Sequence, residues 1–363
     1  MMPIALVVLS PPPLRCVRPP ARDRVRRLRC RASSEEGVSR GTGLLSWAGG
    51  VVPQSALVGG AKAGWRALWT AMVTELAPQS RSGAYVRPKS SVASTDVRDS
   101  DTLVLYVGNT CPWCHRTTLA LALRGGTGSA ETRLPTVRVV SLTDDAERAS
   151  RGGWVLSSPA GDPLFGARDL REVYDAACGG RYSGRCTAPL LVNARTRAAV
   201  SNDSAAICAR ISGTAAEGAV EALNAMITSD VNNAVYQSGF ATSQSAYDDA
   251  QRRLWPALAA LDARLARTQF LHGASPTSSD IFLYPTAVRF DAVYAVLFKC
   301  CAQRLADYPH LWRWMGEMHA LPGVGATLDF EGMRRSYFSQ LFPLNPGLIC
   351  PRGPTAEQVG LGA

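Results

Sequence analysis

The spacing of apolar residues changes along the chain, and the change separates a mixed region from a helical one. Between residues 101 and 213, short β-rich runs alternate with segments whose apolar positions recur at helical spacing. The predicted elements are a strand at 102–107, a helix from 112 that ends at the glycines 125 and 126, a strand at 135–142, a helix at 167–180, strands at 188–192 and 198–202, and a helix within 201–212. Their order is therefore β-α-β-α-β-β-α.

The strand signal disappears after about residue 215. Helical spacing of apolar residues then dominates, so residues 214–330 are predicted to form an all-helical domain. The four predicted helices lie at 218–237, 243–267, 277–301 and 310–323. Residues 331–363 carry aromatic residues and prolines, and we expect this C-terminal extension to wrap back over the body.

The segments that precede residue 101 are less strongly patterned. Residues 35–60 are rich in Gly, Ser and Val and are interpreted as a flexible arm. Residues 61–100 form an N-terminal extension that contains an amphipathic helix, which we expect to pack on the body rather than on a membrane. The apolar face of that helix consists of Trp65, Leu68, Trp69, Met72 and Leu76.

The positive charge is concentrated at the N-terminus. The chain has a net charge of +10, and residues 1–34 account for +7 of it through eight arginines and one acid, Asp23. An Arg-rich, acid-poor leader is typical of an organellar transit peptide, with the chloroplast as the first expectation and the mitochondrion as the alternative. A disordered basic tail is the other interpretation. Because the remaining charge is small, nucleic acid is not an expected partner, and no apolar run approaches the ~20 residues that span a bilayer.

The segment "NTCPWCHR" carries the most specific chemistry. Cys111 stands between a predicted strand and a predicted helix, where unpaired N–H groups and the helix dipole favour a thiolate. Asn109 or Thr110 is expected to cap that helix, with Pro112 in its first turn. Cys111 is thus the natural nucleophile. Cys114, one turn later, is either a resolving thiol or a packing residue. The eight cysteines after the leader are scattered, as in a protein with mostly free thiols.

The same residues match the Cys-x-x-Cys-His signature of c-type haem attachment. That interpretation is disfavoured, because a haem would displace the packing of the long apolar helix that follows. Zinc is also disfavoured, since no second Cys/His pair has ligand spacing. We therefore expect neither a metal nor a haem. His115 is expected to lie along the helix surface, with an influence on the reactivity of Cys111 as the alternative.

Two later segments contain groups that suit a peptide ligand. A cis-proline at Pro189 in "TAPLLV" would face Cys111 and leave the backbone of Ala188 free to bind a peptide, and an edge-strand proline is the alternative. In "VSNDSAAI", Asp203 and Ser204 stand at a helix N-terminus, which can hold a carboxylate, and Asp203 can also pair with an ammonium group. Simple helix capping is the alternative. Glutathione presents both groups at its γ-glutamyl end.

The order of elements is the one that a thioredoxin-like domain requires. Together with "RGGW", "GRCTAPLLV", "RFDAVYAVLFKC" and "NPGLICPRGP", these segments resemble the glutathionyl-hydroquinone reductases, omega-like glutathione transferases of the xi class, over roughly residues 62–354. The resemblance implies a thioredoxin-like N-terminal domain at 101–213, an all-helical C-terminal domain, and a homodimer. Many members have alanine at position 114, and the Cys-Pro-Trp-Cys form looks like that of photosynthetic organisms.

The resemblance also implies roles for individual residues. Glutathione would be bound by Trp154, Arg185, Ala188, Pro189, Asp203 and Ser204. An aromatic substrate would be bound by Tyr236, Tyr294 and Tyr337. The chain departs from the family at Asp203, where glutamate is common, and at Ser336-Tyr337-Phe338, where the family usually has His-Tyr-Tyr.

Three functions are consistent with these residues. The first is reductive removal of glutathione from glutathionyl-hydroquinones through a Cys111–glutathione mixed disulfide, with glutathione as co-substrate. The second is glutaredoxin-like thiol transfer or dehydroascorbate reduction that uses Cys111 and Cys114. The third is a non-enzymatic ligand-binding role. Conjugation of glutathione to electrophiles is disfavoured, since it needs a Ser or Tyr hydroxyl where Cys111 stands.

Overall fold

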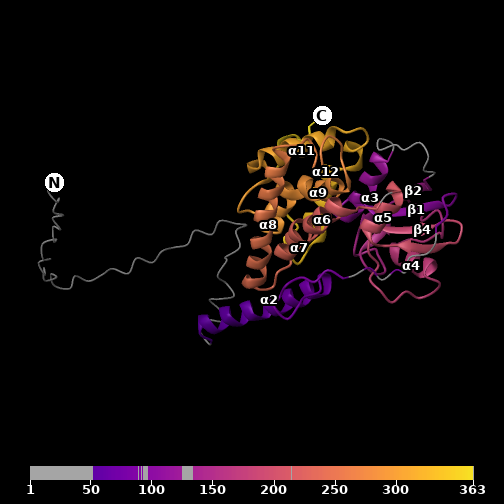
Figure 1. Cartoon of the computed structure of the whole chain (residues 1–363). Helices are drawn as coiled ribbons and strands as arrows, with labels where there is room; N and C mark the ends of the chain where they lie inside the picture. The colour runs from indigo at the N-terminus through magenta and orange to yellow at the C-terminus, as the bar shows by residue number, and fades with distance from the viewer. Residues whose placement is uncertain are drawn as a thin grey trace, which may run out of the picture. The chain divides into compact units, whose positions relative to one another are not determined.

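A computed structural model describes residues 52–88, 90, 92, 97–124, 134–213 and 215–362 (Figure 1). The predicted transit peptide therefore lies outside the described residues. The chain divides into two compact units, Met1–Ala61 and Lys62–Ala363. Helix α2, Gln54–Leu76, begins inside the segment predicted as a flexible arm. The second unit contains the end of α2, the sheet and all the later helices.

The part of α2 that belongs to this unit differs from its prediction. Trp65 and Leu68, expected on a buried face, are 53% and 54% exposed. The C-terminal end of the helix packs on the body, where Val73 is fully buried and the Trp69 Nε1–H donates to the carbonyl of Pro343 at 2.8 Å. Helical spacing predicted the helix, but it did not indicate which of its apolar residues are buried.

A five-stranded mixed sheet forms the first domain. Its strand order is β3-β2-β1-β4-β5; β1 and β2 are parallel, and the other neighbours are antiparallel. The strands are β1 Thr102–Gly108, β2 Thr136–Asp144, β3 Trp154–Leu156, β4 Leu190–Asn193 and β5 Ala198–Ser201. The sequence analysis missed β3, so the order is β-α-β-β-α-β-β-α. Three residues after the positive-φ glycines Gly152 and Gly153 are too few to show a periodicity.

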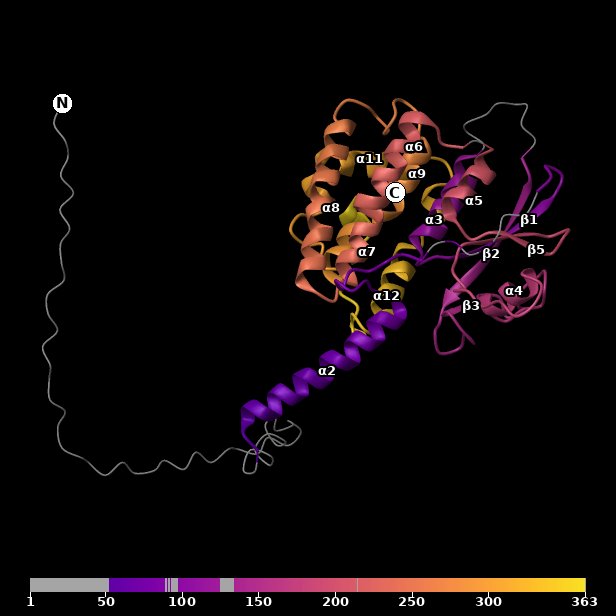
Figure 2. The ribbon, with the colours of Figure 1, turned by 60° about the horizontal axis from the view of Figure 1, so that its bottom comes forward.

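Strand β1 is buried on both faces because helices cover both sides of the sheet (Figure 2). Leu103 and Leu105 pack with residues of α3, Pro112–Leu123, and α5, Ser204–Ser212. The alternate residue Tyr106 packs on the other side. A strand covered on both faces reads as a continuous apolar run, as it does in this sequence.

Helix α4, Leu170–Ala177, covers that other side. Its buried residues are Leu170, Val173, Tyr174 and Ala177, which is the face that helical spacing predicts.

The rest of the unit is helical, as expected, but two of the four predicted helices contain a π-turn. These turns are η1, Ile227–Asn232, and η2, Phe290–Tyr294. The α-helices are α6 Gly218–Met226, α7 Asn233–Gly239, α8 Gln244–Leu265, α9 Ser278–Arg289, α10 Ala295–Leu297 and α11 Pro309–Ala320. Short 3₁₀ turns occur at Leu305–Asp307, Gly325–Thr327 and Glu357–Val359. Helix α12, Phe330–Gln340, lies in the C-terminal extension, where no helix was predicted.

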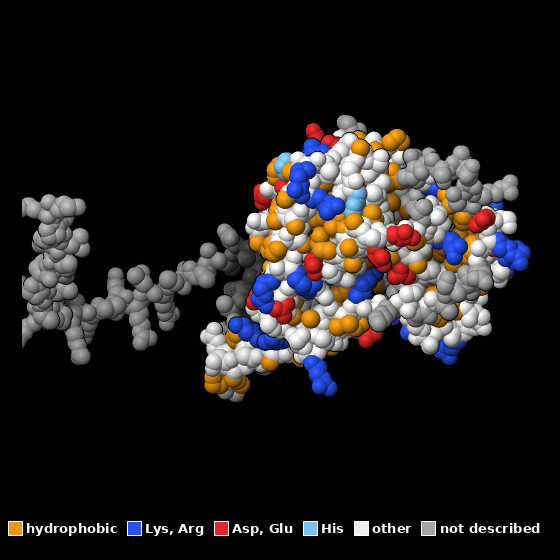
Figure 3. All heavy atoms as spheres, viewed as in Figure 1, with side chains coloured by type: hydrophobic (Ala, Val, Ile, Leu, Met, Phe, Trp, Pro, Cys, Tyr) orange, Lys and Arg blue, Asp and Glu red, His pale blue; other side chains and the backbone are white. Residues whose placement is uncertain are grey.

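The surface of the helical part is mixed in charge. On the face drawn in Figure 3, Lys and Arg side chains are interspersed with Asp and Glu. Among the described residues, no helix combines the length and hydrophobicity that a membrane crossing needs.

Asp280 anchors the core of the helical domain. It is fully buried, and its Oδ1 accepts hydrogen bonds from the backbone N–H of Leu271 and the indole Nε1–H of Trp314, both at 2.9 Å. Its Oδ2 accepts from the backbone N–H of Thr277 at 2.8 Å, which closes a capping box at the start of α9. One carboxylate thus joins a loop, a helix start and α11.

We expect Asp280→Ala to destabilise the protein by about 3 kcal/mol or more, because it removes a helix cap and leaves buried donors without an acceptor. The free energy of unfolding, from urea denaturation followed by tryptophan fluorescence, measures this loss. Asp249→Ala is the control, since Asp249 is exposed on α8 and such changes stay within about 0.5 kcal/mol. Equal losses for the two variants would contradict the anchoring role.

Candidate active site

The nucleophile candidate caps its own helix. Cys111 occupies the N-cap of α3 with extended backbone angles, φ −76° and ψ 117°, and its Sγ accepts the backbone N–H of Cys114 at 3.4 Å. Pro112 is the first helical residue, where its missing N–H costs no bond. The prediction that Asn109 or Thr110 caps the helix is therefore wrong. A half-buried sulfur now stands where a capping oxygen is usual.

The surroundings of Cys111 favour the thiolate. Burial alone would raise the pKa of its thiol, but hydrogen bonds from the Cys114 thiol and from the backbone N–H groups of Cys114 and Trp113, together with the charge of Arg87, lower that pKa to about 7. The guanidinium of Arg87 stacks on the ring of Trp113, 3.4 Å from its centroid. Sequence reasoning missed Arg87, which lies outside the motif.

Cys114 is placed differently. Its side chain is almost fully buried, at 1% exposed. Burial, and then the neighbouring Cys111, raise the pKa of the Cys114 thiol well above its usual range. Cys114 is therefore a proton donor to Cys111 at neutral pH, not a second thiolate.

The peptide bond between Ala188 and Pro189 is cis, as predicted. The carbonyl of Ala188 faces the nucleophile and accepts a hydrogen bond from the Cys111 thiol at 3.4 Å. The residue that precedes cis-Pro189 and β4 therefore lies directly beside the sulfur.

Asp203 and Ser204 open α5, where they were expected. Asp203 is the N-cap, and its Oδ1 accepts the backbone N–H of Ala206 at 2.8 Å. The buried Ser204 Oγ accepts a hydrogen bond from Arg116 at 3.5 Å. The capping interpretation of Asp203 thus holds in this structure, and it leaves the second carboxylate oxygen available.

Trp154 is the first residue of β3, and Arg185 lies in the loop before β4. The ring of Trp154 packs so closely on Gly108, the last residue of β1, that a Cβ there would come within 2.1 Å of the ring. Position 108 therefore requires glycine. The guanidinium of Arg185 donates to the carbonyl of Leu76 at 2.9 Å, which ties the loop before β4 to the end of α2.

The three predicted tyrosines form one cluster. The hydroxyl of Tyr337 lies 2.6 Å from that of Tyr236 and 3.3 Å from that of Tyr294. Burial raises the pKa of all three phenols, and the charge of Cys111 raises those of Tyr236 and Tyr337 further. The cluster is consequently neutral at physiological pH and lies within electrostatic reach of Cys111.

Arg289, at the end of α9, was missed by sequence reasoning. Its charge acts on Tyr294 and Tyr337, and its hydrogen bonds reach the cysteine loop, residues 109–111. It is fully buried, and its guanidinium donates to the carbonyls of Asn109 at 3.0 Å, Thr110 at 3.3 Å and Pro285 at 2.8 Å. A further N–H donates to His115 Nδ1 at 3.0 Å. The two residues before the nucleophile are thus held by a side chain from the helical domain.

His115 is buried at 3% exposure, so the prediction that it lies along the helix surface is wrong. Its Nε2 lies 2.8 Å from the hydroxyl of Thr327, which completes the pairing of both ring nitrogens. Burial, and then the charges of Arg289 and His319, lower the pKa of His115 well below its usual range. A neutral His115 can accept from Arg289, whereas a charged one could not.

A second unpredicted link runs through Ser336 of α12. Its Oγ accepts a hydrogen bond from the Thr110 hydroxyl at 2.8 Å and donates to Asp144 Oδ2 at 3.2 Å. Burial raises the pKa of Asp144 to about 6 despite that bond. The neighbouring Phe338 is buried at 2% exposure. The departure from His-Tyr-Tyr thus substitutes a small hydroxyl at position 336 and an apolar ring at position 338.

Among the described residues, no group of three or more His, Cys, Asp or Glu side chains could hold a metal ion. The chemistry assembled around Cys111 is that of a thiol beside phenol hydroxyls.

Comparison with known proteins agrees with this arrangement. Residues 244–317 match the family model described as "Glutathione S-transferase, C-terminal domain". The glutathionyl-hydroquinone reductase YqjG of Escherichia coli is 35% identical over 277 residues, which cover 71% of this chain and 81% of that protein.

Solved structures show the same fold. The xi glutathione S-transferase of Phanerochaete chrysosporium matches with a TM-score of 0.66 at 29% identity, over 74% of this chain and 97% of that one. The glutathione-bound structure of YqjG from Escherichia coli matches with a TM-score of 0.61 at 31% identity, over 76% of this chain and 92% of that one. These matches confirm a thioredoxin-like domain followed by a helical glutathione transferase domain. The chain belongs to the glutathionyl-hydroquinone reductase family of xi-class, omega-like glutathione transferases.

Proposed function

We propose that this protein is a glutathione-dependent reductase that removes glutathione from glutathionyl-hydroquinones. The observation that carries the proposal is the position of Cys111, a thiol of lowered pKa between the backbone of Ala188 and the tyrosine cluster. The relative in Escherichia coli is named for this activity, and its solved structure contains glutathione. Both support the proposal.

Glutathione lies along β4 in this proposal. The Ala188 backbone next to Pro189 pairs with the peptide, the N-terminus of α5 at Asp203 and Ser204 receives the γ-glutamyl end, and Trp154 and Arg185 line the remaining side. This places the glutathione sulfur near Cys111.

The first chemical step forms a disulfide. An aryl carbanion is a very poor leaving group, so the substrate ring first takes its keto form, with a proton on the carbon that carries sulfur. The Cys111 thiolate then attacks the glutathione sulfur, the carbon–sulfur bond breaks, and its electron pair returns to the ring as a hydroquinone oxyanion, which takes up a proton. Both sulfurs are oxidised to the mixed disulfide while the ring carbon is reduced.

The tyrosine cluster supplies protons for this step. Because Tyr236, Tyr294 and Tyr337 keep their protons, their hydroxyls can donate to the substrate oxygens as negative charge develops there. Phe338, which lacks a hydroxyl, adds no donor, so this proposal assigns proton transfer to the three tyrosines alone.

A second glutathione completes the cycle. Its thiolate attacks the mixed disulfide, releases Cys111 and leaves as glutathione disulfide, so that each turnover consumes one glutathione. The buried, protonated Cys114 argues for this one-thiol route over internal resolution by a second cysteine. Thiol transfer by a Cys111–Cys114 pair and a purely ligand-binding role are correspondingly not favoured.

We further propose that the protein acts as a homodimer on quinone-derived small molecules in the chloroplast. The family resemblance supports the first statement, and the arginine-rich composition of residues 1–34 supports the second.

We expect Cys111→Ser to lower turnover of a glutathionyl-hydroquinone by about 10³-fold or more, because it removes the nucleophile. Cys114→Ala should retain turnover within about tenfold, since a second glutathione resolves the mixed disulfide. Intact-mass analysis should find a glutathione adduct on Cys111 in both the unmodified protein and Cys114→Ala. Loss of turnover in Cys114→Ala with Cys111 intact would instead support the two-thiol route.

The reactivity of Cys111 should rise with pH and reach half of its maximum near pH 7, because the thiolate is the reactive form. Arg87→Gln removes a charge that lowers this pKa, so the midpoint should move to higher pH. The rate of iodoacetamide alkylation of Cys111, measured by peptide mapping against pH, gives the midpoint. Arg252→Gln on α8 removes the same charge elsewhere and should leave the midpoint in place. An unchanged profile in Arg87→Gln would exclude the role of Arg87.

Arg289 is a positioning residue for the cysteine loop, and both Arg289→Lys and Arg289→Met should lower kcat by about 10²-fold, the cost of a small misplacement of reacting groups. Lysine keeps the charge but lacks the planar fork that reaches Asn109, Thr110 and His115 together. The KM for glutathione should change little, because none of the groups that Arg289 hydrogen-bonds belongs to β4 or α5. If lysine restored full kcat, charge rather than geometry would be the role of Arg289.

A further inference from the structure

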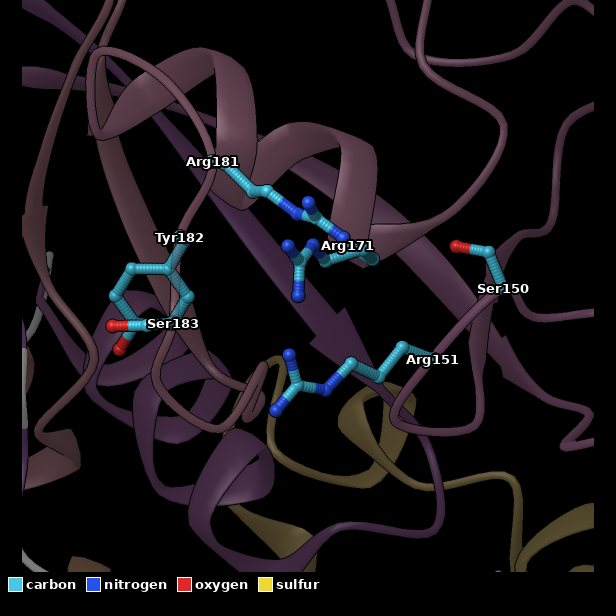
Figure 4. A pocket seen from close by; sticks show the side chains of 6 residues that line it. All are labelled: Ser150, Arg151, Arg171, Arg181, Tyr182 and Ser183. Carbon is cyan, nitrogen blue, oxygen red and sulfur yellow. The ribbon is translucent and has the colours of Figure 1, made fainter.

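A second cluster of charged groups lies beside α4. It surrounds an open cavity of about 460 Å³ lined by Ser150, Arg151, Arg171, Arg181, Tyr182 and Ser183. Figure 4 shows the guanidinium groups of the three arginines gathered at the centre of this cavity. They come from three segments, namely the loop after β2, the first turn of α4 and the loop after α4. Cys111 and the tyrosine cluster do not line it.

The effects of these arginines on their neighbours show how close together they lie. A hydrogen bond from Arg171, and also the charges of Arg171 and Arg181, lower the pKa of Asp175. Burial raises the pKa of the Cys186 thiol, whereas Arg171 and Arg151 both oppose that rise. The charge of Arg171 thus acts on the same neighbouring groups as the charges of the other two arginines.

The positive charge of the cavity is not balanced. Among the residues that the structure describes, Asp175 is the carboxylate within ion-pair distance of the cluster, with Arg171 Nε to Asp175 Oδ2 at 2.8 Å. The three arginines therefore bring three positive charges to the cavity, against the single carboxylate that forms an ion pair with one of them. Like charges held together raise the free energy of the folded protein, and a bound anion would reverse that effect.

Hydrogen bonds hold the walls of the cavity in place. Asp175 Oδ1 accepts the backbone N–H of Tyr182 at 2.6 Å, which fixes the loop after α4 against that helix. Asp169 Oδ2 accepts the backbone N–H of Ser150 at 2.7 Å, which fixes the other loop. The turn after α4 needs Gly179, whose φ is +76°. A site built in advance in this way loses little entropy on binding.

The geometry points to a tetrahedral oxyanion as the occupant, and we propose that this cavity binds a phosphate or sulfate group at a site separate from the one around Cys111. A carboxylate has a single charge and two coplanar oxygens. Phosphate and sulfate have oxygens directed out of one plane and a charge close to −2. These properties match the guanidinium groups of Arg151 and Arg181, which come from different segments. The hydroxyls of Ser150 and Ser183 supply further donors. The proposal does not depend on the reductase function.

Calorimetric titration of the full-length protein with inorganic phosphate and with phenyl phosphate, at constant ionic strength in chloride buffer, tests this site. We expect one phosphate per chain. The double variant Arg151→Gln/Arg181→Gln should weaken binding at least tenfold, since each change removes a positive charge and its hydrogen bonds to the anion. Arg171 is left intact because it holds Asp175. Tight binding of phenyl phosphate would identify an ester-binding site, and binding of inorganic phosphate alone a site for the free ion.

The matched control is Arg252→Gln/Arg267→Gln, which removes two exposed arginines outside the cavity and should bind phosphate within twofold of the unmodified protein. Thermal unfolding establishes that both double variants are folded. The proposal fails if the unmodified protein binds neither probe at millimolar concentration, or if Arg151→Gln/Arg181→Gln binds as tightly as the control. It also fails if S-methylglutathione displaces the phosphate, because the arginines would then serve the glutathione site.

Discussion

The buried guanidinium of Arg289 is the interaction on which the active site depends. Removing a charged group from water is costly, and among the described residues no carboxylate pairs with this one. Its cost is offset by three backbone carbonyls and the neutral ring of His115, which use the donors of the guanidinium almost completely. Because two of those carbonyls directly precede Cys111, the helical domain determines where the first domain presents its nucleophile.

The same arrangement explains why the two cysteines of the motif behave differently. Cys111 lies at the open end of α3, where N–H groups and Arg87 stabilise negative charge. Cys114 lies one turn further along α3, where its side chain is buried from solvent. A Cys-x-x-Cys spacing is thus compatible with one-thiol chemistry whenever the helix buries its second cysteine.

Much of the fold could be predicted from the sequence, because it rests on local patterns. The apolar run of β1 and the buried face of α4 each show the periodicity of their element. Residue type also indicated parts of the site. A cysteine followed by proline marked the start of α3, Pro189 marked the cis peptide bond, and Asp203 marked the start of α5. The strand β3 is too short to show a period. The exposed face of α2 shows that an amphipathic pattern does not establish what covers it.

The unpredicted parts of the site are long-range pairings. Arg87, Arg289 and Ser336 act on residues far away in the sequence, and nothing in their immediate neighbours distinguishes them from surface or capping residues. His115 was misplaced for the same reason, since its partners come from the helical domain. Single-sequence patterns report local environments, whereas these contacts are created only when distant parts of the chain pack together.

The π-turn η2 gives one helix two functions at the active site. In a regular α-helix, Arg289 and Tyr294, five residues apart, would point in directions about 140° apart. The π-turn hydrogen-bonds residues five apart, as the bond from the Ala295 N–H to the Phe290 carbonyl shows, and so aligns positions with that separation. The helix can therefore hold the cysteine loop with one residue and complete the phenol cluster with the other. The register of this turn is thus part of the catalytic apparatus, since a regular α-helix over the same residues would carry Tyr294 to a different face from Arg289.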